Sequence, residues 1–464
     1  MCSRSLQFIN SLQPLTFFSH RRSISSYGLL LLPLVSFFSR ANDILIGMML
    51  AEEIKARGLV EHTSAPLEKI FSAQRTAYLG IDPTSDSMQV GNLAVMLLMK
   101  RLSTAGHKLV FLVGGGTGMI GDPKETGERM MLDEKIVATN TLALKAQLKK
   151  ILGTTPFKMV DNADWLSKTK LLPFLRDVGK HFTVNDLIKR EIIKKRLDTP
   201  GESISYTEFT YALLQGFDYL TLHEKYGADL QVGGSDQWTN MLSGVDLIRK
   251  HLGEQVYALC MPLVEDSAGK KFGKSEGNAI WLDPKKTSPF HFYQFWINLP
   301  DTRVETYLKA YTFLPIAEID ALMELHRRNP GERQAQETLA RLVTEIVHGP
   351  AVTAQVAAAT DALFGDTSFH RLSCEALAVA LAEAPSVEIS RRGLAEGYSL
   401  AEALVAGGLA FSKSDARRLI SGKGIMLSGQ TIGNPDQKVY LGDLSNGYAL
   451  VRKGKQGVLV LVLK

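Results

Sequence analysis

The stretch YLGIDPTSDSMQVGN, residues 78–92, decides the fold that this sequence predicts. Residues 77–81 are apolar or small and predict a short buried strand, whereas residues 82–86 are rich in turn formers. Asn92 can cap the helix that the apolar periodicity of residues 93–97 predicts. A strand that runs into a helix N-terminus presents free backbone N–H groups and the positive end of a dipole. The unit therefore suits an anion such as phosphate, although many such units are purely structural.

The composition is that of a globular protein with several domains. A chain of 464 residues exceeds a single core and predicts about three domains. Hydrophobic residues make up 45% and charged residues 22%, as in an ordinary soluble protein. The net charge of +5 is unevenly spread, because residues 391–464 carry 11 Lys and Arg against 5 Asp and Glu. This basic tail favours a polyanionic partner.

The cysteines and histidines predict neither a disulfide framework nor a metal centre. The three cysteines, Cys2, Cys260 and Cys374, are too few and too scattered for either, which fits a reducing compartment. The ten histidines show no ligand spacing, so we expect no structural metal.

Residues 1–48 differ in composition from the rest of the chain. They are rich in serine, contain four arginines, and include an apolar run at residues 28–38 that is too short to span a bilayer. We favour an upstream extension outside every folded domain, with folding from about Met48 or Met49 and a cytoplasmic location. The alternative is a transit peptide and a mitochondrial matrix location; the arginines and serines fit it, but the apolar run does not.

A second strand, predicted at residues 108–113, runs into a glycine-rich turn. Within that turn, Gly116, Gly118 and Gly121 match the dinucleotide fingerprint G-x-G-x-x-G. No helix pattern opens at Gly121, however, because residues 122–129 read as a polar loop, and the acid expected about 20 residues later is not clearly placed. An NAD-dependent dehydrogenase is therefore a minor alternative.

Residues 133–200 read as mostly helical, with an interruption at residues 162–165. The next helix opens at Ser205 with a capping-box pattern. Tyr211, Gln215 and Asp218 follow at steps of four and three, so they share one face among apolar neighbours. A buried polar stripe needs partners, because an unpaired buried polar group costs about 1 to 3 kcal/mol. Those partners are either internal hydrogen bonds or a ligand.

A third strand, at residues 229–232, ends in another glycine-rich turn before a helix. Two crevices at strand carboxyl ends are where an open parallel sheet binds its ligand. Further on, Lys271 and Lys274 flank Gly273 in a loop. Two ammonium groups so placed can clamp an oligophosphate while the glycine lets the loop change shape, although a solvated loop is the simpler interpretation.

The remainder of the chain predicts helices and then a small basic unit. The pattern is helical from Pro289 to about Phe364, broken at residues 330–331, and residues 365–397 are linker-like. Two helices at 400–407 and 412–421 precede a hairpin at residues 424–432. Four cations of this unit suit an RNA backbone, with a merely soluble surface as the alternative: Lys413, Arg417, Arg418 and Lys423.

In combination these segments resemble the bacterial-type tyrosyl-tRNA synthetases, which are class I aminoacyl-tRNA synthetases. The resemblance covers residues 52–464 and is carried by residues 82–84, 89–92, 114–123, 178–182, 211–218, 231–238 and 271–275. It implies an α/β fold: a Rossmann-like parallel-sheet catalytic domain, an α-helical domain and a small C-terminal α+β S4-like RNA-binding domain. The expected bounds are 49–290, 291–370, a linker at 371–396, and 397–464.

The resemblance also implies how an amino acid substrate is held. Tyr78 and Asp218 would hydrogen-bond the phenol of L-tyrosine, which argues against a tryptophanyl enzyme. A site built to satisfy a hydroxyl group rejects the analogue that lacks it, and this family is the standard example. The remaining tyrosine contacts would be Asp122, Tyr211 and Gln215 to the α-ammonium group, and Gln237 near the carboxylate.

For the second substrate, ATP with Mg²⁺, the resemblance assigns two further sets of residues. The residues expected to bind ATP are Gly91, Gly234, Asp236 and Lys274. The residues expected to act in catalysis are Gln89, Asn92, Lys271, Lys274 and Arg129. Gln89 departs from the family, which usually has histidine there; its amide donates a hydrogen bond but carries no charge. The loop before Arg129 is about one residue shorter than the usual pattern, which affects Lys124.

The implied reaction is attack of the tyrosine carboxylate on the ATP α-phosphorus, followed by acyl transfer to the 3′ end of tRNA(Tyr). It requires positioning and charge stabilisation but no protein nucleophile. The resemblance further implies a homodimer with no membrane association. The main alternative function is a synthetase-derived RNA-binding protein that no longer activates tyrosine, with Gln89 as the lesion.

Overall fold

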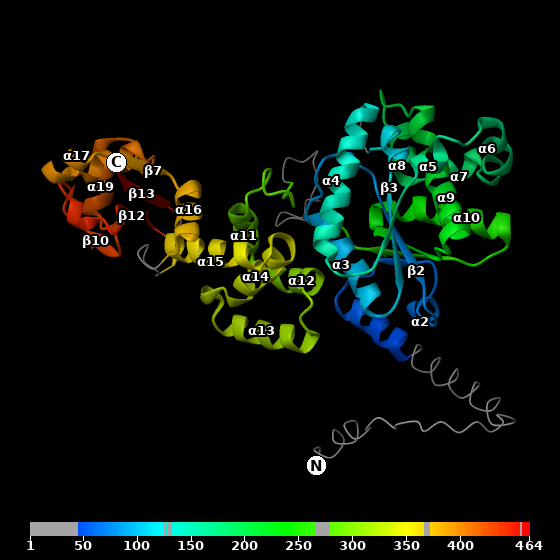
Figure 1. Cartoon of the computed structure of the whole chain (residues 1–464), viewed down its shortest axis with the longest axis horizontal. Coiled ribbons are helices and arrows are strands. Elements are labelled where there is room, and N and C mark those ends of the chain that lie inside the picture. Colours follow the sequence, from blue (N-terminus) through cyan, green and yellow to red (C-terminus); the bar gives the residue numbers. More distant parts are fainter. Residues whose placement is uncertain (1–44, 125–126, 128–131, 265–278, 366–371, 455–456) are drawn as a thin grey trace, which may run out of the picture.

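The computed structural model describes residues 45–124, 127, 132–264, 279–365, 372–454 and 457–464. The chain forms an elongated molecule, with an N-terminal α/β domain at one end, helices in the middle and a small C-terminal domain at the other end (Figure 1). The predicted extension, residues 1–48, lies outside the described residues except for its last four. Those four belong to a helix through residues 45–56.

A six-stranded sheet in the order β1-β6-β5-β2-β3-β4 organises the N-terminal domain. Strands β2 to β6 are parallel, and β1 pairs antiparallel with β6. The chain runs outward from β2 through β3 and β4, and then continues on the other side of β2 with β5 and β6. The order therefore reverses between β2 and β5, where open parallel sheets bind ligands. The strands span His62–Thr63 (β1), Thr76–Ile81 (β2), Lys108–Val113 (β3), Lys158–Asp161 (β4), Leu230–Gly234 (β5) and Tyr257–Met261 (β6).

The sequence predicts three of these strands and misses three. The predictions at 77–81, 108–113 and 229–232 match β2, β3 and β5 to within two residues. Strand β4 lies in the segment that the sequence predicts as mostly helical, and four residues are too few for alternation to be visible. The predicted interruption that follows it is wrong, because Ala163–Leu166 forms the short helix α5.

Alternate residues of the strands pack against two different helical layers. Tyr78 shares a buried cluster with Tyr219 on one face of the sheet, whereas Leu79 shares another with Leu97 on the other face. This is the period of two expected of a strand that is covered on both sides. In Figure 1, α3 and α4 cover one face and α9 and α10 the other. The helices of this domain are α2 (Leu67–Ile70), α3 (Val90–Thr104), α4 (Glu134–Leu152), α5 (Ala163–Leu166), α6 (Leu171–Asp177), α7 (Val184–Leu187), α8 (Glu191–Asp198), α9 (Tyr206–Tyr226) and α10 (Trp238–Leu252).

Helix α3 begins three residues earlier than the sequence predicts. Gln89 occupies the N-cap position, so the prediction that Asn92 caps the helix is wrong. Asn92 lies in the first turn, and its side-chain oxygen accepts a hydrogen bond from the Gln89 backbone N–H at 3.1 Å. The predicted start of α9 is confirmed, because the Ser205 hydroxyl accepts from the Glu208 N–H at 3.2 Å. The Glu208 carboxylate pairs with Arg196 at 3.0 Å.

The middle of the chain is helical, as the sequence predicts for residues 289–364. The break is a 3₁₀ turn at Pro330–Glu332. Arg57 ties this part to the N-terminal domain, because its guanidinium donates to the backbone carbonyls of Lys309 at 3.1 Å and Leu314 at 2.6 Å. The helices are α11 (Pro289–Ile297), α12 (Asp301–Tyr311), α13 (Ile316–Arg328), α14 (Gln334–His348) and α15 (Pro350–Phe364). Among the described residues, no helix is long and apolar enough to cross a membrane.

The C-terminal domain is built on a five-stranded sheet in the order β10-β9-β12-β13-β7. Strand β7 pairs parallel with β13, so residues 371–396, predicted as a linker, instead contribute helices and a strand of this sheet. The predicted helices and hairpin are present. The elements are α16 (Cys374–Glu383), β7 (Ser386–Ile389), α17 (Arg391–Glu396), β8 (Tyr398–Ser399), α18 (Leu400–Ala406), α19 (Lys413–Ser421), β9 (Ile425–Leu427), β10 (Gln430–Ile432), β11 (Lys438–Val439), β12 (Tyr448–Lys453) and β13 (Gly457–Leu463).

We predict that Gly244→Ala destabilises the N-terminal domain by about 1 to 3 kcal/mol, because overpacking a close helix contact costs that much. A Cβ added at Gly244 in α10 would lie 2.6 Å from the ring of the fully buried Tyr219 in α9. Gly442→Ala is the matched control, since nothing lies within 4 Å of its added Cβ. Thermal unfolding checks this; equal melting temperatures for the two variants would contradict the close packing of α9 and α10.

Candidate active site

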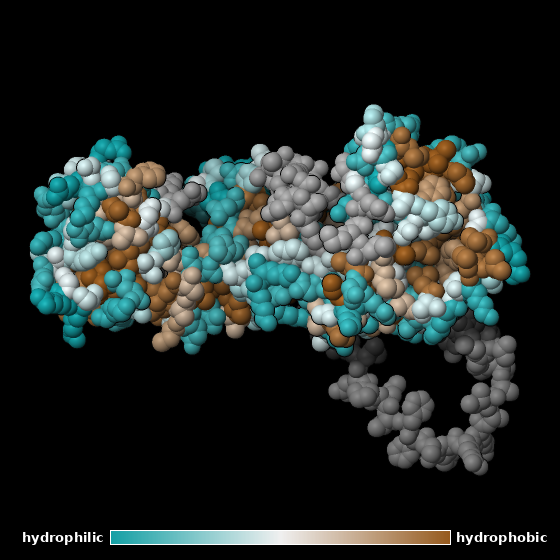
Figure 2. Space-filling view, turned by 90° about the horizontal axis from the view of Figure 1, so that it is seen from above, coloured by the Kyte–Doolittle hydropathy of each residue, from teal (hydrophilic) through white to brown (hydrophobic). Residues whose placement is uncertain are grey.

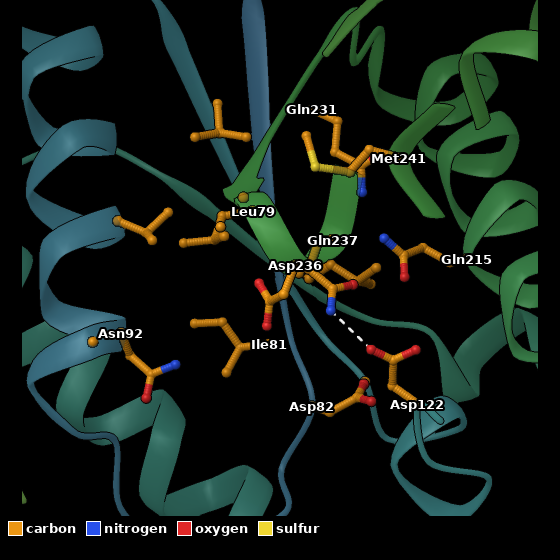
Figure 3. Close-up of a pocket in the computed structure, with 18 of the residues that line it drawn as sticks. Leu79, Ile81, Asp82, Asn92, Asp122, Gln215, Gln231, Asp236, Gln237 and Met241 are labelled. Carbon is orange, nitrogen blue, oxygen red and sulfur yellow. Dashed lines mark hydrogen bonds between the residues drawn. The ribbon is translucent and has the colours of Figure 1, made fainter. Parts of the chain in front are cut away.

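A cavity of about 360 Å³ lies at the carboxyl ends of β2 and β5 (Figure 3). Strands β2 and β5 and helices α3 and α9 contribute side chains to it. The structure brings together every predicted substrate and catalytic residue that it describes: Tyr78, Gln89, Gly91, Asn92, Asp122, Tyr211, Gln215, Asp218, Gly234, Asp236 and Gln237. The three remaining predicted residues, Arg129, Lys271 and Lys274, lie outside the described residues.

Tyr78 and Asp218 both line the buried part of this cavity. Tyr78 is 1% exposed and Asp218 is 2% exposed. Within the described part of the chain, the Tyr78 hydroxyl has no hydrogen-bond partner. Burial and the neighbouring Tyr219 and Asp218 raise its pKa well above the usual value, so the group stays protonated and can donate. An unsatisfied buried hydroxyl is costly, so its presence at a cavity indicates a ligand that supplies the missing partner.

Two side chains hold the Asp218 carboxylate in place. Trp165 Nε1 donates to Oδ1 at 2.8 Å, and Asn162 Nδ2 donates to Oδ2 at 2.8 Å. Burial raises the pKa of Asp218 to about 7, although these two hydrogen bonds act against that rise. A carboxylate has about four acceptor positions, so Asp218 can still accept a hydrogen bond from a ligand hydroxyl.

A chain of hydrogen bonds connects Asp218 to the opposite wall of the cavity. Asn162 Nδ2 also donates to Thr117 Oγ1 at 2.8 Å, and Thr117 donates to Asp82 Oδ1 at 2.7 Å. The Tyr211 hydroxyl donates to Asp82 Oδ2 at 2.7 Å. The network fixes the orientation of both Tyr211 and Asp218. The sequence analysis missed Asn162 and Asp82 as parts of the site; the signal for Asp82 was its place directly after the carboxyl end of β2.

The middle of the cavity is acidic. Asp122 accepts hydrogen bonds from Gln237 Nε2 at 2.8 Å and from Asn240 Nδ2 at 3.0 Å, and the former is the dashed line in Figure 3. Gln215 points into the same space, and Asp82 lies nearby (Figure 3). None of the described lining residues is basic. Four carboxylates line the cavity: Asp82, Asp122, Asp218 and Asp236. This composition favours a cationic group such as an ammonium ion.

Residues 89–92, at the start of α3, form one rim of the cavity. Backbone hydrogen bonds join Val90 N–H to Ile280 O at 3.0 Å and Leu282 N–H to Met88 O at 2.9 Å. Leu263 and Val264 line the cavity as well. Val264 and Ile280, which are described and precede and follow Lys271 and Lys274 in the sequence, therefore both lie at this rim.

The glycine-rich turn after β3 does not offer its N–H groups to a dinucleotide. Gly115 N–H donates to Asp161 at 3.1 Å and Gly116 N–H donates to Asn162 at 2.7 Å. Gly118 and Gly121 donate to backbone carbonyls of the same turn at 2.7 and 2.9 Å. Because these donors are occupied, the fingerprint match does not indicate a pyrophosphate site, and the dehydrogenase alternative loses its only motif.

The predicted RNA-binding cations lie on and beside α19, in the C-terminal domain. Three of them form exposed ion pairs at 2.7 to 2.8 Å: Lys413 with Glu402, Arg417 with Asp436, and Arg418 with Asp415. Exposed pairs of this kind contribute about 0 to 1 kcal/mol, so a phosphate can replace the carboxylates at small cost. Lys423 follows the helix in a left-handed backbone conformation, with φ of 57°.

Comparison with known proteins agrees with this geometry. Residues 72–365 match the model of the class I tRNA synthetases (W and Y), and residues 376–461 match the C-terminal domain of the tyrosine–tRNA ligase SYY-like type. The tyrosine–tRNA ligase of Roseiflexus castenholzii is 43% identical over 413 residues, which is 87% of this chain and 97% of that protein. That of Bacteroides thetaiotaomicron is 40% identical over 430 residues, covering 90% of this chain and all of the relative.

The chain belongs to the class I tyrosine–tRNA ligase family. A solved structure supports the relationship independently: a C-terminally truncated mitochondrial tyrosyl-tRNA synthetase of Aspergillus nidulans has a TM-score of 0.60 and 32% identity, covering 66% of this chain and 92% of that one. The enzyme therefore carries the synthetase fold in its N-terminal and central parts and a family-specific C-terminal domain.

We predict that Trp165→Phe raises the pKa of Asp218 above its value of about 7, because a donor that stabilises the carboxylate is lost. Trp296→Phe is the matched control, since the buried Trp296 N–H has no partner in the described part of the enzyme. Carbon-13 NMR titration of labelled aspartate measures the pKa. An unchanged value in Trp165→Phe, or an equal change in both variants, would refute the role of Trp165.

Proposed function

We propose that this enzyme activates L-tyrosine with ATP to give tyrosyl-adenylate and then transfers the tyrosyl group to the 3′ end of tRNA(Tyr). The observation that carries the proposal is the buried Tyr78 hydroxyl, which lacks a described partner and lines the same cavity as the Asp218 carboxylate, a group that helps to raise its pKa. This pair offers one donor and one acceptor, which is what a phenol hydroxyl needs. An indole N–H could use only the acceptor, and phenylalanine could use neither.

The tyrosine substrate would lie with its phenol at Tyr78 and its α-ammonium group among the carboxylates. Asp122 and Gln215, which lie on the same side of the cavity in Figure 3, would accept hydrogen bonds from the ammonium group. The Tyr211 hydroxyl donates a hydrogen bond to Asp82, so its oxygen lone pairs can accept a hydrogen bond from the substrate. Gln237 donates a hydrogen bond to Asp122, which orients its amide, and it would lie near the substrate carboxylate.

ATP would bind along the rim formed by the start of α3 and the end of β5, with Gly91, Gly234 and Asp236 as contacts. An acidic cavity cannot hold a triphosphate unless cations enter from elsewhere. Mg²⁺ would neutralise part of that charge. The candidate protein cations are Lys271, Lys274 and Arg129. The first two lie in the sequence between Val264 and Ile280, and both of these residues are at the rim.

The first chemical step would be in-line attack of the tyrosine carboxylate on the α-phosphorus, with pyrophosphate leaving. The residues would act by positioning and by stabilising charge on the pentacoordinate transition state. Gln89 and Asn92 stand at the start of α3, where the backbone N–H groups and the helix dipole also favour a phosphoryl group. Neutral amides suffice for this role if the cations supply the charge.

Exposed apolar side chains support the homodimer that the family resemblance implies. Figure 2 shows a hydrophobic area on the N-terminal domain. Helices α6 and α7 and their surroundings contribute exposed apolar residues: Leu171, Leu172, Leu175, Val184 and Ile188. A surface of this kind is typical of a protein interface.

Cys260 and Cys374 form no disulfide in the described chain, in keeping with a reducing location such as the cytoplasm or the mitochondrial matrix.

We predict that wild-type enzyme catalyses tyrosine-dependent exchange of labelled pyrophosphate into ATP, and that Tyr78→Phe lowers the preference for tyrosine over phenylalanine by about tenfold, since one hydrogen bond is worth about 1 kcal/mol or more. The exchange rates with each amino acid give the ratio. Absence of exchange in the wild type would favour the alternative of an RNA-binding protein that does not activate tyrosine. If the wild type exchanges but the ratio is unchanged in the variant, Tyr78 does not contribute to recognition of the phenol.

Lys274→Ala should slow adenylate formation at least tenfold with little change in tyrosine affinity, because a pyrophosphate contact is made mainly in the transition state. Lys285→Ala is the control, as an exposed lysine beyond the same loop. Single-turnover kinetics and equilibrium tyrosine binding separate the two quantities. A wild-type rate in Lys274→Ala, or equal slowing in both variants, would remove Lys274 from the proposed catalytic set.

A further inference from the structure

Phe411 is the most exposed large hydrophobic residue of the described chain. Its relative exposure is 98%, and it lies in the turn between α18 and α19. Its neighbour Ala410 is buried and donates its N–H to Leu404 O at 3.1 Å. The Phe411 N–H itself donates to Asp415 Oδ2 at 3.2 Å, and Ser412 caps α19. The backbone is therefore fixed on both sides while the ring projects into solvent.

Cations surround this turn. Lys413, Arg417 and Arg418 follow Phe411 on α19, and each has a side chain that is at least three-fifths exposed. From the other side, Lys453 Nζ donates to Leu409 O at 2.9 Å, two residues before Phe411. The electrostatic influence of Lys453 extends to Asp415, the carboxylate that anchors the Phe411 backbone. An exposed aromatic ring within a cationic surface matches the chemistry of an unpaired nucleotide, which has a π-face and a phosphate.

We propose that Phe411 is a stacking platform for an unpaired base of the bound tRNA, with the cations of α19 holding the adjacent phosphates. This inference rests on the proposed function, since it assumes that the C-terminal domain binds tRNA. Two observations about Phe411 support it. The solvent-exposed phenyl ring adds nothing to the fold, yet contacts of Ala410, Ser412 and Asp415 fix the backbone that carries it. The ring lies in the domain farthest from the catalytic cavity (Figure 1).

The test compares Phe411→Ala, Phe411→Leu and Phe411→Trp in the full-length enzyme. We expect Phe411→Ala to weaken tRNA(Tyr) binding and to raise the KM for tRNA by about 5- to 150-fold, because one aromatic–base stack contributes about 1 to 3 kcal/mol. Phe411→Trp should retain wild-type affinity, whereas Phe411→Leu, which keeps apolar bulk without a π-face, should lose most of it. Tyrosine-dependent pyrophosphate exchange should be unchanged in all three variants.

Salt dependence separates stacking from charge. Phe411→Ala should leave the slope of log affinity against log salt concentration unchanged, because stacking releases no counterions. Arg417→Ala should reduce that slope by about one if Arg417 contacts a phosphate. Equal reductions in both variants would show that the effect of Phe411 is indirect and would overturn the inference.

The outcomes distinguish this inference from the proposed function. If wild-type enzyme exchanges pyrophosphate and charges tRNA, but Phe411→Ala binds tRNA as tightly as wild type, the stacking inference fails and the proposed function stands. If the wild type neither binds nor charges tRNA, the proposed function fails at its second step. If Phe411→Ala instead changes the sedimentation of the enzyme without tRNA, the ring is a protein contact and the inference is overturned.

Discussion

The buried carboxylate of Asp218 is the group on which the architecture of the site depends. A carboxylate in this position is unfavourable, because burial raises its pKa from 3.8 to about 7. Since the folded state then binds the proton more tightly than the unfolded chain, this group makes the fold less stable as pH rises from about 4 to 7. Trp165 and Asn162 limit that cost by donating hydrogen bonds to both oxygens.

The parallel sheet is what brings the supporting groups to Asp218 from distant parts of the chain. Asn162 lies directly after β4, Thr117 lies after β3, and Asp82 lies directly after β2, so three strand ends contribute one residue each. Helix α9 supplies both Tyr211 and Asp218, seven residues apart on one face. The hydrogen-bond network that joins them therefore links the carboxyl ends of β2, β3 and β4 to α9, and it orients the polar groups before any substrate arrives.

Much of this arrangement could be predicted from the sequence, and the physical reasons for the failures are specific. The apolar runs of β2 and β3 are long enough to be recognised, and the spacing of Tyr211, Gln215 and Asp218 places them on one helix face. Strand β4 was missed because it is four residues long and lies among helices. Asn162 was missed for a related reason: its role arises from the pairing of β3 with β4, which no local pattern records.

The charge distribution of the described cavity is one-sided. The described cavity wall supplies carboxylates and neutral amides, and no basic side chain comes from it. Under the proposed function, the sheet and α9 would recognise the amino group and the phenol. Arg129, Lys271 and Lys274, which the sequence places in loops, would supply the cations that a triphosphate requires.

The most direct test of the central claim is a crystal structure of the enzyme with a non-hydrolysable tyrosyl-adenylate analogue. The account predicts that the phenol oxygen of the analogue lies within about 3 Å of both the Tyr78 hydroxyl and an oxygen of Asp218, which is hydrogen-bond distance. An analogue bound with its phenol directed to solvent, or with Asp218 bonded only to Asn162 and Trp165, would contradict it.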